Sequence, residues 1–291
     1  MNTGAYAATT DMPPALVALR ANKPLLFLLA GALGGAAGSV LAEFAPGGGR
    51  GASAVSLIVT TGLWSAIAAS VLCAALFAAG EWHQRRELRP RRISKLLLFG
   101  ALAGFLSGAV AQAAFSVQIG SAAFHAIVVR TVCWALMGAL LGALLSRPVP
   151  NLGLLRGLLG GAVGGGLGGI GFLLVGQVLP DAIGRLVGIG TLGLALGLAM
   201  IVVEKLFREA SLEVIWAPGE TTNFNLGAQA VTIGGGEDHV FVRGLPHHFA
   251  SIVFANGVIE YVETATGTRT PLKHGSRLEI GKLNLVIHAA K

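Results

Sequence analysis

Charged residues are scarce in this sequence. Asp, Glu, Lys and Arg together occupy 12% of the 291 positions, while hydrophobic residues occupy 54%. Charged residues make up about 25% of a typical soluble domain. The low share therefore argues against an ordinary soluble enzyme and indicates a chain that lies mostly in lipid.

Cysteine is also scarce, and the sequence patterns of catalytic and metal sites are missing. The only cysteines, Cys73 and Cys133, lie inside apolar runs, so a disulfide framework is not expected. No group of His and Cys has the spacing of metal ligands, and the serines in the apolar runs have no consistent His and Asp companions. We therefore predict that the chain is not an enzyme and needs no cofactor and no metal.

Glycine, by contrast, is abundant, with 43 residues, about twice its average usage. Many of these glycines recur at four-residue spacing within long apolar runs. In lipid, small residues at this spacing let helix backbones approach closely, so dispersion contacts accumulate. We therefore expect an α-helical polytopic membrane bundle with glycine-zipper packing. The expected helix-packing residues are Gly31, Gly35, Gly100, Gly104, Gly108, Gly157, Gly161, Gly165 and Gly169.

Six apolar segments approach the roughly 20 residues that a bilayer requires. They lie near 24–44, 53–80, 95–117, 121–146, 152–179 and 182–207. Positive charge gathers in every second connection, most densely at Arg85, Arg86, Arg89, Arg91, Arg92 and Lys95. The positive-inside rule then predicts a bacterial-type inner membrane protein with both termini in the cytoplasm, including an N-terminal arm over 1–22. We assign the net charge of +7 to this topology and to lipid headgroups, not to nucleic acid.

The apolar segments form three pairs that resemble one another. Leucine- and glycine-rich patterns start at Pro24, Lys95 and Gly153, and Thr61-Gly-Leu-Trp64 resembles Thr131-Val-Cys-Trp134. Such repeats predict three two-helix hairpins in the same orientation, whereas many transporters contain inverted repeats. The alternative is chance similarity, because sequences rich in Gly, Ala and Leu align easily with themselves.

The composition changes abruptly after Arg208. Short runs rich in Val, Ile and Phe alternate with Gly, Asn and Pro, which is typical of a β-sandwich over 211–291. Asn256-Gly257 lies between two such runs and predicts a hairpin, because both central positions of that turn require a positive φ. The expected strands are 212–216, 230–233, 239–243, 251–255, 258–262, 277–280 and 283–288.

Three stretches of this region resemble the signatures of forkhead-associated (FHA) domains in order and spacing. They are Val231-Thr-Ile-Gly-Gly235, Thr264-Ala-Thr-Gly-Thr268 and Leu272-Lys-His-Gly-Ser-Arg-Leu-Glu-Ile-Gly281. FHA domains are eleven-stranded β-sandwiches that bind phosphothreonine peptides through loops at one end. The resemblance therefore implies a small FHA-like interaction domain over roughly 211–290.

The residues that bind phosphate in FHA domains are replaced here. Gly235 stands where the family has an arginine, Pro246-His247-His248-Phe249 replaces a Ser-Arg-x-His motif, and Thr266 replaces an asparagine. A phosphate dianion needs charged donors for tight binding, so we expect protein contact without a phosphothreonine requirement. The partner-binding candidates are Gly235, Arg243, His247, His248, Thr266, Gly267 and Thr268. The alternative for both histidines is exposed loop residues with no ligand.

Arg130 is the most unusual residue of the apolar region, because it lies well inside the fourth segment. A charge there costs about 2.5–3.5 kcal/mol on insertion scales, so it should have a partner. Gln112 and Glu43 are the expected partners by depth. The polar candidates are Glu43, Gln112, His125, Arg130, Gln177, Asp181 and Arg185. They form either a structural tie between helices or a site open to the far side of the membrane.

These observations favour a membrane scaffold over an enzyme. The bundle is expected to anchor and to form a homo-oligomer or a larger membrane complex, while the FHA-like domain recruits a cytoplasmic protein for signalling. The alternative is a channel or transporter with a polar site around Arg130, regulated by the C-terminal domain.

Overall fold

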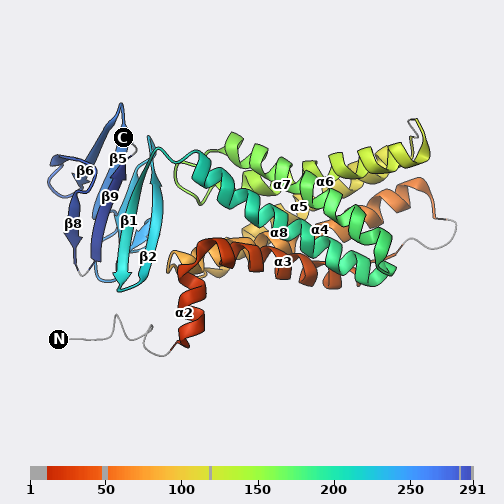
Figure 1. Cartoon of the computed structure of the whole chain (residues 1–291), viewed down its shortest axis with the longest axis horizontal. Coiled ribbons are helices and arrows are strands. Elements are labelled where there is room, and N and C mark those ends of the chain that lie inside the picture. Colours follow the sequence, from red (N-terminus) through yellow and green to blue (C-terminus); the bar gives the residue numbers. More distant parts are fainter. Residues whose placement is uncertain (1–11, 48–51, 118–119, 282, 290–291) are drawn as a thin grey trace.

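The computed structural model describes residues 12–47, 52–117, 120–281 and 283–289, apart from the side chains of 123, 181 and 182. A helical bundle is followed by a β domain at one of its ends (Figure 1). We call this end of the bundle proximal and the opposite end distal. The long helices are α3 (Lys23–Ala42), α4 (Ala54–His83), α5 (Pro90–Phe115), α6 (Ala122–Ser146), α7 (Leu154–Val178) and α8 (Asp181–Leu206).

Six helices of the described chain are long and apolar enough to cross a membrane, which indicates a multi-pass membrane protein. The six predicted segments match them, with boundaries that differ by a few residues. Local chemistry explains several of the starts. Ser53 and Ser121 cap α4 and α6 by accepting hydrogen bonds from Ser56 and Phe124 N–H groups, and Pro90 begins α5.

The expected N-terminal arm contains a further helix, α2 (Pro14–Ala21). It ends at Asn22, whose side chain accepts a hydrogen bond from Leu25 N–H and so caps α3. The last part of the arm is therefore ordered by contacts with both the bundle and the β domain.

Three glycine-rich helices each pack backbone to backbone on a neighbour. A Cβ added at Gly31 of α3 would overlap the Gly193 carbonyl oxygen of α8. At Gly104 of α5 it would overlap the Ser65 carbonyl oxygen of α4, and at Gly161 of α7 the Gly138 carbonyl oxygen of α6. The remaining predicted packing glycines also lie at these contacts: Gly35, Gly100, Gly108, Gly157, Gly165 and Gly169. Only glycine permits such close approach.

In α3 and α7, a second row of glycines follows the packing glycines described above by three residues each, and it packs on a different neighbouring helix. In α3 this row is Gly34 and Gly38, which meet α4; in α7 it is 160, 164 and 168, which meet α8. The corresponding row of α5 is Ala103, Ser107 and Ala111. The contact of α5 with α6, which we call the α5–α6 seam, therefore lacks a glycine row on α5.

The β domain consists of two sheets. The first has the order β2 (Glu220–Leu226), β1 (Ala210–Ala217), β9 (Leu283–Ala289), β8 (Arg277–Ile280). The second has the order β4 (Val240–Phe241), β3 (Val231–Gly234), β5 (Ala250–Ala255), β6 (Val258–Glu263), β7 (Arg269–Leu272). Leu212, Phe224 and Leu285 of the first sheet pack with Ile233 and Ile252 of the second in one buried core.

The predicted hairpin is confirmed, since Asn256 and Gly257 have φ values of 52° and 78° and join β5 to β6. Seven of the nine described strands were predicted, with small shifts of their ends. The strands β2 and β7 were not predicted. FHA domains have eleven strands, so the described residues form two fewer.

Candidate functional site

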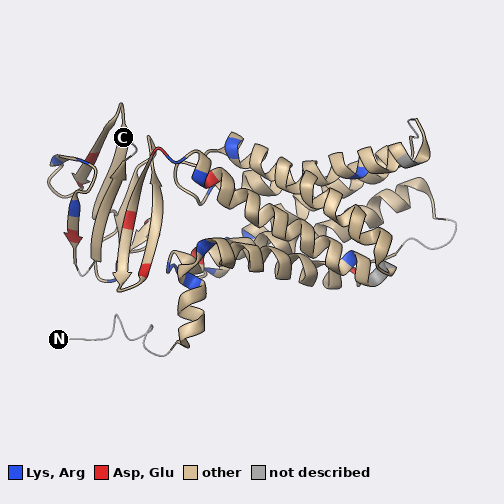
Figure 2. Ribbon diagram, viewed as in Figure 1, with Lys and Arg blue, Asp and Glu red and all other residues tan. Residues whose placement is uncertain are grey.

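Charged residues gather where the bundle meets the β domain, while the middle parts of the helices carry few (Figure 2). We call this contact the junction. On the bundle side it comprises Arg20, residues 81–92, Asn151 and Arg208; on the β side it comprises β2 and the loop 235–239. The junction joins segments far apart in sequence, so its geometry decides how the two parts work together.

Glu220 of β2 forms the first half of the junction. Its carboxylate lies 3.0 Å from Nη2 of Arg20 and also pairs with Arg85. The Arg85 guanidinium lies over the Trp216 ring, 5.2 Å from the ring centre. These three charged side chains are only 10–16% exposed, so the ion pairs are shielded from water. Thr222 adds a hydrogen bond from its hydroxyl to the His83 carbonyl, 3.3 Å long.

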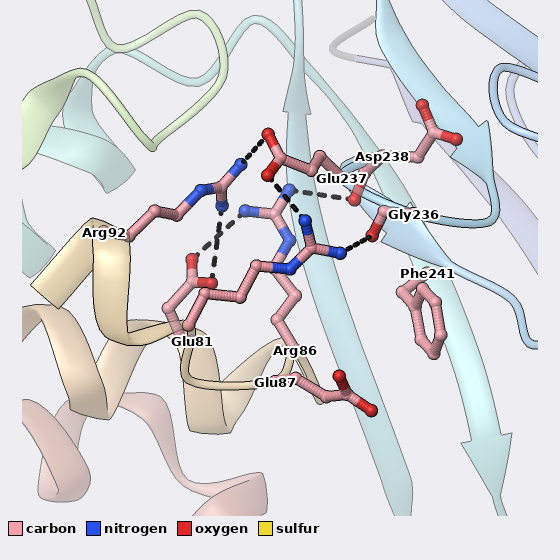
Figure 3. Close-up of a pocket in the computed structure, with 9 residues that line it drawn as sticks. Glu81, Arg86, Glu87, Arg92, Gly236, Glu237, Asp238 and Phe241 are labelled. Atoms are coloured by element: carbon pink, nitrogen blue, oxygen red, sulfur yellow. Dashed lines mark hydrogen bonds and ion pairs between the residues drawn. The ribbon is translucent and has the colours of Figure 1, made fainter.

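The loop 235–239 forms the second half (Figure 3). Glu237 bridges Arg89 and Arg92 at 2.6 and 3.0 Å, and Arg86 donates to the Asp238 carbonyl oxygen at 3.2 Å. Behind them, the Glu81 carboxylate lies 3.2 Å from Arg86 and 3.6 Å from Arg92. Three arginines of the basic block thus hold one acidic loop, with Glu81 as a shared counter-ion.

The ion pairs around the loop 235–239 differ in how deeply they are buried, and therefore in how much they contribute to stability. The Glu81 and Arg86 side chains are 4% and 9% exposed, whereas Glu237 is 52% exposed. Burial lowers the pKa of Arg86, and the Glu81 carboxylate opposes that shift. Exposed ion pairs contribute little, but removing one partner of a buried pair leaves an uncompensated charge. Glu81 is therefore expected to contribute more to the stability of the junction than the exposed Glu237 does.

Asn151 ties the connection between α6 and α7 to the β domain. Its φ of 59° is in the left-handed region, which Asn tolerates better than most residues. Its amide nitrogen donates to the carbonyl oxygens of Asn225 and Gln229 at 3.0 and 2.9 Å, and its oxygen accepts from Gln229 N–H at 2.8 Å. Arg208 donates to the Asn225 side chain at 2.9 Å. The β domain is thus fixed by polar contacts from four segments of the bundle.

The space enclosed between Glu81, Arg89 and Glu237 is only about 20 Å³ (Figure 3). Small-molecule sites usually occupy about 300–1,000 Å³. This part of the junction is therefore a contact between two parts of the chain and not a ligand pocket.

Strand register brings three loops of the β domain to one end of the second sheet. Ile233, near the end of β3, pairs with Ala250 at the start of β5, which pairs with Glu263 at the end of β6. The loop 235–239 follows β3, the loop 242–249 precedes β5, and the loop 264–268 follows β6. The predicted partner-binding residues are thus located at one end of the domain, as FHA likeness would require.

The individual candidates differ in their surroundings. Gly235 is buried, while Arg243 is exposed and makes no hydrogen bond or ion pair among the described residues. Thr266, Gly267 and Thr268 are exposed, and the Thr266 hydroxyl donates to Glu263 at 2.7 Å. The loop 264–268 is therefore the most accessible part of the predicted set.

His247 and His248 lie around Asp238, which was not predicted as a site residue. The Asp238 Oδ2 atom lies 3.0 Å from Nδ1 of His247 and accepts a hydrogen bond of 2.8 Å from His248 N–H. Burial alone would raise the pKa of Asp238, but these hydrogen bonds outweigh it and lower the pKa. The hydrogen bond to Asp238 raises the pKa of His247, whereas burial and Arg86 lower the pKa of His239 to about 4.

Two of the intramembrane candidates line a cavity in the distal half of the α5–α6 seam. Its volume is about 550 Å³, and Gln112 and Arg130 line it together with Trp64, Trp134 and Phe172. This volume is in the range of small-molecule sites. The cavity opens where α5 lacks a glycine row, because the helices there do not approach as closely.

The expected partners of Arg130 are engaged elsewhere. Glu43 pairs with Arg185 at 2.7 and 3.1 Å, and Gln112 accepts a hydrogen bond of 3.3 Å from Thr61. The Arg130 guanidinium lies over the Phe115 ring, 5.5 Å from its centre.

The other intramembrane candidates are dispersed. His125 packs against the edge of the Phe115 ring at 5.5 Å, and Gln177 is exposed on α7. The Asp181 side chain lies outside the described residues.

The comparisons with protein-family models, with curated proteins and with solved structures found no match to this chain. Sequence reasoning missed Glu81, Glu220, Asn151 and Asp238. Glu81 carried a usable signal, because an acidic residue at the end of an apolar span needs a partner. Glu220 and Asn151 carried none, since their partners lie 74 residues or more away in the sequence, and Asp238 carried none because strand pairing brings it beside His247.

Proposed function

We propose that the chain is a membrane scaffold. The bundle anchors it in a bacterial-type inner membrane, and the FHA-like β domain recruits a cytoplasmic protein. The observation that carries this proposal is the junction, which fixes the β domain through β2 and the loop 235–239 and leaves the loop 264–268 exposed. The arginines at the proximal end support a cytoplasmic location for the β domain.

The chemistry of the loop end favours recruitment without phosphothreonine. A Cβ at Gly235 would overlap the Leu245 carbonyl oxygen, so the arginine that FHA domains have there does not fit. Glu237 and Asp238 place negative charge beside His247, which is already hydrogen-bonded to Asp238. A phosphate dianion needs positive donors, and these carboxylates oppose it.

The glycine rows bear on the oligomer that the scaffold would form. Their closest contacts, such as Gly31 with Gly193 and Gly161 with Gly138, lie within one chain. A homo-oligomer would therefore use other surfaces of the bundle.

Co-purification tests the scaffold. Full-length protein in detergent is expected to retain a specific partner, and Thr266→Arg with Thr268→Arg should remove it because the added charge and bulk alter the exposed loop. The matched control is Glu279→Arg, which changes an exposed residue of β8. Phosphatase treatment of the lysate should leave the partner bound. Retention of every partner after deletion of 210–291 would rule out recruitment by the β domain.

A second candidate function is a channel or transporter for an anionic solute. The α5–α6 seam supports it, because a second cavity of about 340 Å³ lies at its proximal end. Four basic residues, Arg86, Arg92, Lys95 and Arg147, line that cavity together with the acidic Glu237, while Arg130 lines the distal one.

A flux assay in liposomes tests this second candidate. We expect Arg130→Ala to reduce anion flux strongly, because Arg130 is the one charged side chain that lines the distal cavity among the residues that the structure describes. Gln112→Ala should reduce flux less, because the positive charge remains. Undetectable flux, or flux that is unchanged in both variants, would contradict the channel or transporter and favour the scaffold.

A further inference from the structure

The scaffold leaves one cluster of the β domain unexplained. Asp238 lies in the loop between β3 and β4, and His247 and His248 lie in the loop before β5. One carboxylate oxygen and one imidazole nitrogen from each histidine all lie within 4.8 Å of one another. The Asp238 side chain is fully buried, whereas the two imidazoles are 55% and 54% exposed. The cluster therefore has a buried anionic base and a solvent-facing side.

The buried carboxylate is incompletely satisfied. Its Oδ2 atom accepts hydrogen bonds from His247 and from His248 N–H. Its Oδ1 atom is buried and accepts no hydrogen bond of regular geometry among the described residues, although His248 Nδ1 lies 2.6 Å away and the Thr232 side chain also interacts with the carboxylate. The Oδ1 and Nδ1 atoms are close, but their orientation is not that of a hydrogen bond. Buried acceptors without a hydrogen bond are rare and require an explanation.

The backbone conformation of His248 and the arrangement of the two imidazole rings also indicate a ligand site. His248 has a φ of 52°, which is uncommon for a residue other than glycine. The two imidazoles stack with ring centres 3.9 Å apart and an angle of 22°, so both Nδ1 atoms face the carboxylate. Strained backbone of this kind persists where the surrounding structure requires it, often at ligand sites.

We propose that Asp238, His247 and His248 bind a divalent transition-metal ion of the zinc class. Two imidazole nitrogens and one carboxylate oxygen are a common zinc donor set, with a fourth position left open. Metal–ligand distances of about 2.0–2.2 Å place tetrahedral donors roughly 3.3 Å apart. His247 Nδ1 lies 3.0 Å from Oδ2 of Asp238, and His248 Nδ1 lies 2.6 Å from Oδ1. All three ligand atoms lie within 4.8 Å of one another, so rotation of the exposed imidazoles would bring them to metal-binding distance. Both imidazoles are more than half exposed, so a metal ion bound here would keep its open position toward solvent.

The surrounding charges permit a cation. Arg86 donates to the backbone oxygen of Asp238 and not to its carboxylate. Its own charge is compensated by Glu81, 3.2 Å away, and Glu237 adds a further negative charge beside the site. His247 and His248 were predicted as partner-binding candidates, but Asp238 was not, because Asp238 and His247 are nine residues apart and become neighbours only through the pairing of β3 with β5.

A bound metal ion would also act on the junction. It would tie the loop 242–249 to the loop 235–239, in which Glu237 contacts Arg89 and Arg92. Metal occupancy would therefore hold this loop in the conformation that contacts the bundle. This consequence depends on the junction geometry and not on recruitment of a partner.

Cobalt titration tests the site. Full-length protein without a histidine tag is stripped of metal in detergent and titrated with Co²⁺, whose visible absorption reports tetrahedral coordination. We expect one Co²⁺ per chain, displaced by Zn²⁺, and an affinity loss of at least ~10-fold in His247→Ala, because one of three ligands is removed. The control is His274→Ala, which alters the other described histidine pair, His274 and His288, with ring centres 5.8 Å apart.

The test uses substitutions of the exposed histidines, because these are less able to unfold the domain than a substitution of the buried Asp238. Because Asp238 is buried, Asp238→Asn could unfold the domain, so the His247→Ala, His248→Ala double variant is used beside the single one. Thermal unfolding without metal checks that the double variant is folded, because the main-chain N–H of His248 still donates to Asp238 in it. A Co²⁺ spectrum that stays that of the hydrated ion, or equal affinity in the double variant and wild type, would show that the cluster only forms hydrogen bonds.

Discussion

The Glu81→Gln variant is expected to lose about 3–5 kcal/mol of stability, the usual cost of removing one partner of a buried ion pair. Glu81 lies 3.2 Å from Arg86 and 3.6 Å from Arg92, and the Glu81 and Arg86 side chains are 4% and 9% exposed. The variant leaves the Arg86 guanidinium buried without its closest counter-ion. Thermal unfolding of the full-length protein in detergent measures the loss. Faster proteolysis near 207–210 would show that the β domain has detached.

Glu43→Gln is the matched control for this variant. Glu43 also pairs with one arginine at a helix end, but the Glu43 and Arg185 side chains are 45% and 39% exposed. Exposed pairs contribute about 0–1 kcal/mol, so this change should have a small effect. Equal effects of the two substitutions would mean that burial of Glu81 does not hold the junction together.

The second large effect is expected for Gly161→Val. A Cβ at this position overlaps the Gly138 carbonyl oxygen and lies 2.9 Å from the Gly142 Cα atom. Because backbone atoms cannot rotate away, α7 must move off α6. Overpacking of this kind costs about 1–3 kcal/mol, and here the contacts of the whole helix pair are affected. We expect a lower unfolding temperature and weaker retention of the folded form in harsh detergents.

Gly176→Val separates packing from helix propensity. Gly176 lies on the same helix, and a Cβ there has no atom within 4 Å. Both substitutions change intrinsic helix propensity equally, so their difference in unfolding temperature reports the backbone contact alone. If Gly176→Val destabilised as much as Gly161→Val, the close packing of α6 on α7 would not be the cause.

The helices could be predicted because lipid imposes a simple rule. A span must be about 20 apolar residues long, and its backbone must satisfy its own hydrogen bonds. All six spans therefore appear in the sequence as long apolar runs. The hairpin at Asn256-Gly257 was equally predictable, because few residues accept positive φ at two consecutive positions.

Two strands could not be predicted, because tertiary contacts stabilise them. In β2 the sequence Glu-Thr-Thr-Asn-Phe-Asn-Leu contains one Glu and two Asn, which are depleted in strands, yet Phe224 and Leu226 enter the core and Glu220 meets the bundle. In β7, Pro271 lowers strand propensity, but β7 is at the edge of its sheet, where proline is tolerated. Burial and position override local preference in both cases.

The site was predictable only in part. The basic block was visible as a topology signal, but its acidic partner Glu237 lies 148 residues after Arg89. No local pattern links such residues. The same applies to Asp238, whose neighbours follow from strand pairing. The absence of a second glycine row in α5 was visible in the sequence, but its consequence, a cavity of about 550 Å³, follows only from how α5 meets α6.

Labelling of single cysteines from one side of the membrane tests the central claim most directly. The variants Gly47→Cys, Glu87→Cys and Thr266→Cys are made in a background without Cys73 and Cys133, and a membrane-impermeant reagent is added to sealed vesicles of one orientation. We predict that positions 87 and 266 react from the same side and position 47 from the opposite side. Reaction of positions 47 and 266 from the same side would contradict a six-span bundle that carries its β domain at the proximal end.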